Sequence, residues 1–125
     1  LLHKGHVDYL SKAADLGDKL IVAVNTDDSV RRLGKSASRP IQDQEARATV
    51  IAALESVAYV VLFNEDTPFE LIQTIAPNVL VNGSDYAVHQ IVGADIVLAN
   101  GGRVETIDFI QGYSTSAIEQ KILKG

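Results

Sequence analysis

The sequence predicts an α/β protein of three layers, in which helices cover both faces of a parallel sheet of about five strands. Short apolar runs rich in β-branched residues alternate along the chain with segments of helical periodicity. Small or acidic residues follow most of these runs, which is typical of the ligand-binding edge of an open parallel sheet. The chain has 125 residues, enough for one core, so we expect residues 1–125 to form a single domain.

Composition narrows the classes of function. The chain has no cysteine, which excludes a disulfide scaffold and a cysteine-ligated zinc site. Its formal net charge is −5 and no basic face is evident, which argues against a general nucleic-acid binder. No apolar run is long enough to span a membrane. We therefore expect a cytoplasmic protein with neither nucleic acid nor membrane as a partner, which holds anionic ligands with a few placed cations and backbone amides.

Two histidines, His3 and His6, flank Gly5 at the start of the chain. Apolar residues recur behind them at helical spacing and predict a helix from Gly5 to about Leu16, with Gly17 as its C-terminal cap. Three residues are close to one helical turn, so both imidazoles can face the same way at the helix N-terminus. Free N–H groups and a partial positive charge favour phosphate at this position, and Gly5 allows a close approach.

Two other interpretations of the histidine pair stay open on these residues alone, namely coincidence and metal binding. A metal site is the weakest of them, because the remaining histidine, His89, lies in a remote polar segment. In an alternating fold a strand should precede the first helix, so we expect the first strand of the sheet to lie before Leu1.

The apolar run over 20–24 predicts a strand buried on both faces. Four polar residues follow it, namely Asn25, Thr26, Asp27 and Asp28. Such residues can bind a ligand at the end of a strand, and they can equally cap a short helix over 29–33. Both interpretations can hold at once.

The segment over 31–40 is basic, rich in Gly and Ser, and carries Lys35 and Arg39. It could close over a triphosphate, or it could form an ordinary solvated loop. A helix is predicted over 41–56, with Arg47 in its first turn. A cation at that position opposes the helix dipole, and a phosphate ligand would explain its presence.

The second half of the chain continues the alternation. A strand over 59–63 precedes a helix with Thr67 as N-cap, Pro68 at its first position and Glu70 closing a capping box. A strand over 79–81 leads into small and acidic residues that include Gly83 and Asp85. The remaining predicted elements are a helix over 91–100, a strand over 104–109 and a final helix over 117–123 that Ser116 and Glu119 cap.

Two stretches of the chain resemble the signatures of a known enzyme superfamily. The stretch Leu2–His6 resembles the H-x-G-H signature of the nucleotidyltransferases, and Gly112–Ser116 resembles their second signature, a Gly-x-Ser-Thr-Ser/Thr turn at the last helix. Within this Rossmann-like superfamily, the chain is most similar to the cytidylyltransferase-like sugar-phosphate enzymes. The nearest group is the adenylyltransferase domain of the bacterial D-glycero-β-D-manno-heptose 1-phosphate enzymes, which matches at Leu16–Asn25, Arg31–Leu33, Ser38–Ile41, Glu65–Pro68, Leu80–Tyr86 and Ala99–Gly102.

The resemblance implies transfer of AMP from ATP to a heptose 1-phosphate, giving ADP-heptose for the lipopolysaccharide core, with Mg²⁺ accompanying ATP. It implies His3, His6 and Lys35 as catalytic residues, and Lys35 with Arg39 on the substrate phosphate. The nucleotide would contact Gly5, Asn25, Asp27, Arg47, Gly83, Asp85, Tyr113, Ser114, Thr115 and Ser116. No metal ligand is assigned to the chain, and a homodimer is common in the family.

Two alternatives to heptose 1-phosphate adenylyltransfer remain. Asn82 and Ser84 stand where the heptose enzymes commonly have Lys and Gly, which leaves open a cytidylyltransferase that acts on glycerol 3-phosphate or a similar alcohol phosphate. The other alternative is a nucleotide-binding module without catalysis, against which the intact pair of His3 and His6 argues.

Overall fold

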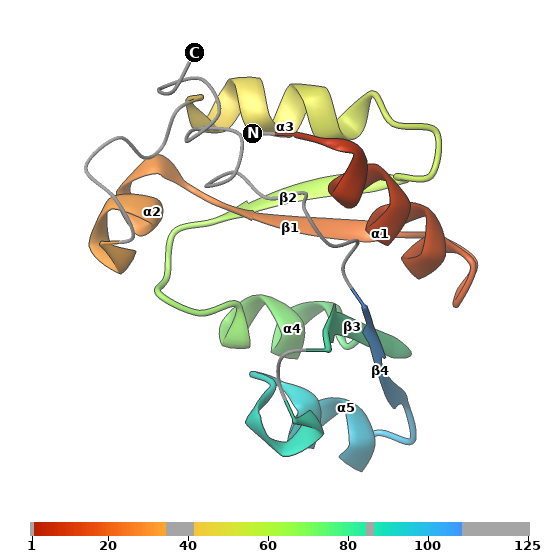
Figure 1. Cartoon of the computed structure of the whole chain (residues 1–125). Helices are drawn as coiled ribbons and strands as arrows, with labels where there is room; N and C mark the ends of the chain where they lie inside the picture. The colour runs from red at the N-terminus through yellow and green to blue at the C-terminus, as the bar shows by residue number, and fades with distance from the viewer. Residues whose placement is uncertain (1, 35–41, 85–86, 109–125) are drawn as a thin grey trace.

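The computed structural model describes residues 2–34, 42–84 and 87–108, and it confirms the α/β class (Figure 1). The predicted helix over 117–123 lies outside these residues. In chain order the elements are α1 (Lys4–Ala14), β1 (Ile21–Asn25), α2 (Asp27–Leu33), α3 (Gln44–Ala52), β2 (Tyr59–Phe63), α4 (Phe69–Ile75), β3 (Val79–Gly83), the 3-10 turn η1 (Val88–Gln90), α5 (Ala94–Ala99) and β4 (Arg103–Ile107).

The four strands predicted within the sequence are present and pair in parallel. β1 pairs with β2, placing Asn25 opposite Phe63, and β3 pairs with β4, placing Gly83 opposite Ile107. Among the described residues β1 has ladder partners only in β2, and β4 only in β3. The predicted single sheet of about five strands is therefore seen in this part of the chain as two parallel pairs.

Helices pack against both pairs of strands. α3 packs against β1 and β2, α5 packs against β3 and β4, and α1 contacts β4. Among the described residues, the buried apolar side chains belong to α1, α4 and α5, to β1 and β2, and to Ile91 before α5. They are Leu10, Ala13, Val24, Phe63, Ile72, Ile91, Ala94 and Val97. Within the described ranges no helix is long and apolar enough to cross a membrane.

Burial along β1 differs from the prediction of a strand covered on both faces. Val24 is buried, whereas Ile21 is 39% exposed and Ala23 is also exposed. Successive side chains of a strand point to opposite faces. The described elements therefore cover the face that carries Val24 more fully than the face that carries Ile21.

Two predicted helix ends are wrong. α1 ends at Ala14 with Asp15 in a right-handed conformation, and Gly17 is not among the residues with positive φ, so Gly17 is not a left-handed cap. Tightened turns close the helix instead, since the N–H of Leu16 donates to the carbonyl of Ala13 at 3.1 Å. α5 begins at Ala94 rather than at residue 91, because Gly93 has a φ of 85° and interrupts the helical backbone.

The start of α4 also differs from the prediction. Pro68 rather than Thr67 occupies the N-cap position, and no side chain caps this end. The helix ends at Ile75, and its C-cap residue Ala76 adopts a left-handed conformation with a φ of 50°. Pro77 follows it, and a residue before proline avoids the right-handed helical region. The chain therefore leaves α4 through a conformation that costs an alanine energy.

Caps on α2 and α3 agree with the polar residues that precede them. Thr26 caps α2, its Oγ1 accepting the N–H of Ser29 at 3.3 Å, and Asp43 caps α3, its carboxylate accepting the N–H of Ala46 at 2.7 Å. These interactions satisfy amides that the helix itself leaves without partners. Both helices thus begin at defined residues close to the end of β1.

Candidate functional site

The two histidines cap the start of α1 reciprocally. His3 is the N-cap residue, and its Nδ1 accepts the backbone N–H of Gly5 at 3.1 Å. The Nδ1 atom of His6 accepts the backbone N–H of His3 at 3.3 Å. This arrangement is a capping box, in which the side chains of the N-cap residue His3 and the N3 residue His6 accept backbone N–H groups at the start of the helix. The sequence folds this way because a nitrogen acceptor is available at both positions.

These two contacts define which imidazole nitrogen carries the proton. A neutral imidazole has one N–H donor and one acceptor nitrogen, and Nδ1 is the acceptor in both His3 and His6. The proton of each ring is therefore on Nε2. The ring centroids are 4.0 Å apart with an interplanar angle of 33°. The two rings thus lie beside each other at the start of α1, each with its proton on Nε2.

Burial favours the neutral form of both rings by lowering the pKa of each. Burial lowers the pKa of His6 to about 4, and the neighbouring His3 contributes in the same direction. Burial also lowers the pKa of His3. A lowered pKa preserves Nδ1 as an acceptor, because protonation would convert it to a donor facing a backbone N–H. The pair is therefore suited to donating hydrogen bonds without itself carrying charge.

The position of the histidine pair agrees with a phosphate seat. Gly5 is buried between the histidines in the first turn. In Figure 1, α1 runs in the opposite direction to β1, so its N-terminus points toward the end of the molecule where β1 gives way to α2. His3, Gly5 and His6 therefore lie together at the N-terminal end of α1, the end that points to the side of the molecule where β1 ends.

A second set of polar contacts lies at the carboxyl end of β1. The side-chain amide of Asn25 donates to the Oγ of Ser29 at 3.0 Å, and this Oγ donates to the backbone carbonyl of Glu65 at 2.9 Å. Ser29 is fully buried. Ser29 thus connects the start of α2 to the segment that follows β2, and the amide of Asn25 holds the Ser29 hydroxyl from the end of β1. Contact of Asn25 with nucleotide stays a prediction.

Thr26 extends this connection between the ends of the two strands. Its hydroxyl donates to the side-chain oxygen of Asn64 at 2.6 Å, in addition to capping α2. Arg32 donates to Asp66 at 2.9 Å and to the backbone carbonyl of Asn64. The ends of β1 and β2 are therefore tied together by side chains as well as by the strand ladder.

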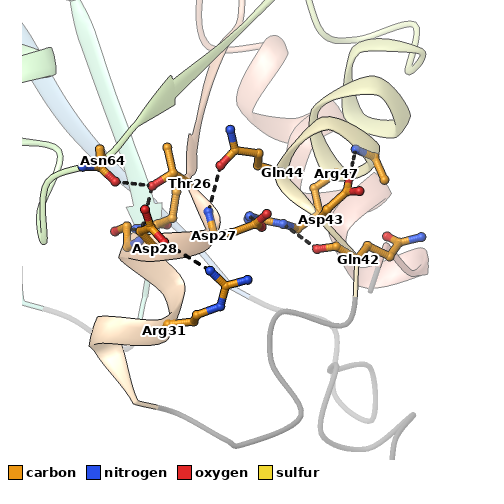
Figure 2. Close-up of polar contacts among 12 residues, drawn as sticks. Thr26, Asp27, Asp28, Arg31, Gln42, Asp43, Gln44, Arg47 and Asn64 are labelled. Carbon is orange, nitrogen blue, oxygen red and sulfur yellow. Dashed lines mark hydrogen bonds and ion pairs between the residues drawn. The ribbon is translucent and has the colours of Figure 1, made fainter.

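The most buried ion pair at this edge joins α2 to α3 (Figure 2). Arg47 donates to a carboxylate oxygen of Asp27 at 2.9 Å, and each side chain is 20% exposed. The Nε–H of Arg47 also donates to the backbone carbonyl of Gln42 at 3.1 Å. In the reverse direction, the backbone N–H of Asp27 donates to the side-chain oxygen of Gln44 at 3.0 Å.

This arrangement gives Arg47 an anionic partner within the protein. Desolvation would raise the pKa of Asp27, but the hydrogen bond from Arg47, a backbone amide at Gln44 and the charge of Arg47 together lower it. The carboxylate therefore stays ionised opposite the guanidinium. An acidic residue, rather than phosphate alone, accounts for a cation in the first turn of α3, and the contact of Arg47 and Asp27 with nucleotide stays a prediction.

The remaining predicted site residues divide into two groups. Gly83 ends β3, is buried, and is followed by Ser84, whose N–H donates to the carbonyl of Ile107 at 3.1 Å. It therefore lies at the carboxyl end of the second strand pair. The others lie outside the described residues, namely Lys35, Arg39, Asp85, Tyr113, Ser114, Thr115 and Ser116.

The sequence did not single out Gln42, Gln44 and Asn64, although each of them makes a polar contact at this edge. Gln44 reaches Asp27 over 17 positions of sequence, and Asn64 reaches Thr26 over 38 positions. Amide side chains, and the backbone carbonyl that Gln42 contributes, have no distinctive spacing, so such contacts are visible only once the elements are packed. The one available signal was Arg47, whose position against the helix dipole required an anionic partner.

Comparison with known proteins identifies a family that this chain matches. The family model described as "Cytidylyltransferase-like" matches residues 1–120. The chain is 54% identical over 123 residues to "Bifunctional protein HldE" of Citrifermentans bemidjiense, covering 98% of this chain and 25% of that protein. It is also 54% identical over 121 residues to the protein of the same name from Azorhizobium caulinodans, covering 97% of this chain and 25% of that one. The chain thus spans about a quarter of the length of these relatives.

A solved structure shows the same fold. The crystal structure of the lipopolysaccharide core biosynthesis protein from Thermoplasma volcanium GSS1 superposes with a TM-score of 0.68. The two chains are 27% identical, and the match covers 91% of this chain and 90% of that one. The Rossmann-like α/β/α architecture that the sequence predicts is therefore shared with a structure determined by experiment.

Proposed function

The chain belongs to the cytidylyltransferase-like family, and we propose that it transfers AMP from ATP to D-glycero-β-D-manno-heptose 1-phosphate. The products are ADP-heptose, a precursor of the lipopolysaccharide core, and pyrophosphate. Relatives named HldE, above half identical over nearly the whole chain, support this choice within the family. The name of the Thermoplasma volcanium neighbour, a lipopolysaccharide core biosynthesis protein, points in the same direction.

The observation that carries the proposal is the pair of neutral imidazoles at the start of α1. In the reaction, an oxygen of the sugar phosphate attacks the α-phosphorus of ATP in line. The bond from that phosphorus to the bridging oxygen breaks, and pyrophosphate leaves with the bonding electrons. Negative charge builds on the phosphoryl oxygens, where the Nε2–H groups of His3 and His6 donate. One such donor contributes roughly 3–4 kcal/mol to lowering the barrier.

The other predicted residues complete the site in the proposal. Gly5 lets the phosphates approach the first turn of α1, and Gly83 lies at the carboxyl end of β3. Lys35 acts on the transferring phosphate, and Lys35 with Arg39 holds the sugar phosphate. The nucleotide site is formed by Asn25, Asp27, Arg47, Asp85, Tyr113, Ser114, Thr115 and Ser116.

Mg²⁺ would accompany ATP and neutralise charge on its phosphates. This ion binds through phosphate oxygens with few protein ligands. Within residues 2–34, 42–84 and 87–108 no three His, Asp or Glu side chains gather as a metal cage. The donor set of this part of the chain therefore fits an ion carried by the nucleotide. We also propose that the protein is cytoplasmic and that it forms a homodimer. Light scattering of the purified protein tests the homodimer.

Pyrophosphate release tests the proposal. ATP and CTP are each offered with heptose 1-phosphate and with glycerol 3-phosphate. We expect rapid release only with ATP and heptose 1-phosphate. Activity confined to CTP and glycerol 3-phosphate would instead favour the alternative that Asn82 and Ser84 leave open. Nucleotide binding without release from any pair would favour a non-catalytic module.

A further inference from the structure

We propose that Asp27 is a positioning residue for ATP, acting through the guanidinium of Arg47. The inference rests on the proposed function and sharpens it, because it assigns Asp27 a role that needs no contact with the nucleotide. Asp27 is the first residue of α2 and Arg47 lies in the first turn of α3, so one ion pair connects the starts of two helices.

The contacts around Arg47 fix the direction of its side chain. Its guanidinium is held from two sides, by the carboxylate of Asp27 at 2.9 Å and by the backbone carbonyl of Gln42 at 3.1 Å. Two directed hydrogen bonds restrict a planar guanidinium far more than one contact would. With Arg47 only 20% exposed, the group is held in place rather than free in solvent.

The contacts around Asp27 hold the other half of the pair. Its backbone N–H donates to Gln44, so α2 and α3 are joined in both directions by contacts 2.9–3.0 Å long. Asp27 also follows directly on Thr26, which caps α2 and hydrogen-bonds Asn64 beyond the end of β2. The carboxylate is therefore held at a fixed position at the sheet edge, and its hydrogen bond fixes the position of the Arg47 guanidinium.

The chemistry of the pair favours positioning over direct contact. A carboxylate repels the phosphates of ATP, so Asp27 can lie near a triphosphate without weakening binding only if a cation balances its charge. Arg47 supplies that cation and keeps further N–H groups beyond the two used here. Loss of Asp27 would leave Arg47 charged but loosely directed, and small misplacements of a binding group weaken catalysis strongly.

A double-mutant cycle in the full-length protein tests this inference. Steady-state KM and kcat for ATP are measured by pyrophosphate release, and equilibrium binding of ATP is measured beside them. We expect Asp27→Ala to raise KM and the dissociation constant about tenfold, the size of one charge-assisted hydrogen bond. The conservative Asp27→Asn, which retains an acceptor oxygen, should recover part of this loss. In an Arg47→Ala background, Asp27→Ala should add less than a twofold change.

Asp28→Ala is the matched control. Asp28 lies beside Asp27 in the first turn of α2, but its side chain is 75% exposed and pairs with Arg31 at 3.1 Å on the surface. The Asp28→Ala substitution removes the same charge from the same helix end as Asp27→Ala, and we expect it to change ATP binding less than twofold. An Asp28→Ala effect equal to that of Asp27→Ala would overturn the inference, since it would show a general effect of charge.

The remaining outcomes also decide the question. An equal loss from Asp27→Ala with and without Arg47 would overturn the inference, because Asp27 would then act independently of the guanidinium. A fall in kcat at unchanged KM and unchanged ATP binding would show that Asp27 acts on the transition state rather than on the position of bound ATP, and would overturn the inference too. The expected coupling in ATP binding, without pyrophosphate release, would uphold positioning while refuting the proposed transfer. An unaltered protein that does not bind ATP would overturn both.

Discussion

Substitution of His6 separates the two functions of its ring. Nδ1 accepts the N–H of His3 and so caps α1, while Nε2–H is the donor proposed to act on phosphate. Asparagine places its side-chain oxygen near the position of Nδ1, and glutamine can place its N–H near the position of Nε2. His6→Asn should therefore keep the cap and lose the donor, His6→Gln should do the reverse, and His6→Ala should lose both.

The expected magnitudes follow from these contacts. Loss of a helix cap costs about 0.5–2 kcal/mol of stability. Because the capping contact of His6 is long, at 3.3 Å, the effect in His6→Ala should lie near the lower limit. Loss of one donor to a developing charge lowers turnover about 10²–10³-fold. We therefore expect turnover at least about a hundredfold lower in His6→Ala and His6→Asn, with a smaller loss in His6→Gln.

Two assays read the two functions separately. Urea denaturation followed by circular dichroism gives the free energy of unfolding, and pyrophosphate release at saturating ATP gives turnover. Equilibrium binding of ATP should weaken only modestly in all three variants, because the donor acts mainly on charge that appears during transfer. If His6→Asn turns over as fast as the unaltered protein, the assignment of Nε2–H as the active donor is wrong.

Three further predictions concern pH and stability. The pKa of His6 should be about 4 by NMR titration. An unfolded histidine titrates near ~6.5, so between these two pH values the unfolded state binds more protons than the folded state, and the free energy of unfolding should rise with pH over this window. A free energy of unfolding that does not change with pH there would contradict the buried neutral ring. Ala76→Gly should raise the free energy of unfolding by about 0.5–1 kcal/mol, since relief of the left-handed alanine at φ 50° outweighs the added chain entropy; a loss of stability would show that Ala76 is not strained. Gly102→Ala should cost about 1–3 kcal/mol, because an added Cβ would lie 2.6 Å from the carbonyl of Asn78; Gly17→Ala, with open space around it, is the control and should change little.

The alternation of strands and helices was predictable because it rests on local patterns. The β-branched runs over 20–24 and 59–63 correspond to β1 and β2 within a residue. Errors fall at helix ends, where tertiary contacts compete with capping rules. Thr67 matched a capping box but Pro68 takes that position, and Gly17 matched a C-terminal cap that the earlier end of α1 made unnecessary.

The candidate site was predictable where its residues are close in sequence. His3, Gly5 and His6 fall within one turn, so their joint position follows from the helix alone. The link between Asp27 and Arg47 spans 20 positions and depends on how α2 and α3 meet at the end of β1. The sequence could indicate that Arg47 needed an anion, but only the packed helices identify a carboxylate of the chain as one.

In the proposed mechanism, His3 and His6 present neutral Nε2–H donors to the phosphates of ATP. Nitrogen-15 NMR of the imidazole rings at pH 7, without and with ATP, tests it most directly, and His89 in the exposed turn η1 serves as an internal control. We expect His3 and His6 to be protonated on Nε2 in the free protein, and their Nε2 resonances to move on addition of ATP while those of His89 stay in place. Protonation on Nδ1 in either ring, or resonances of His3 and His6 that do not respond to bound ATP, would contradict the claim.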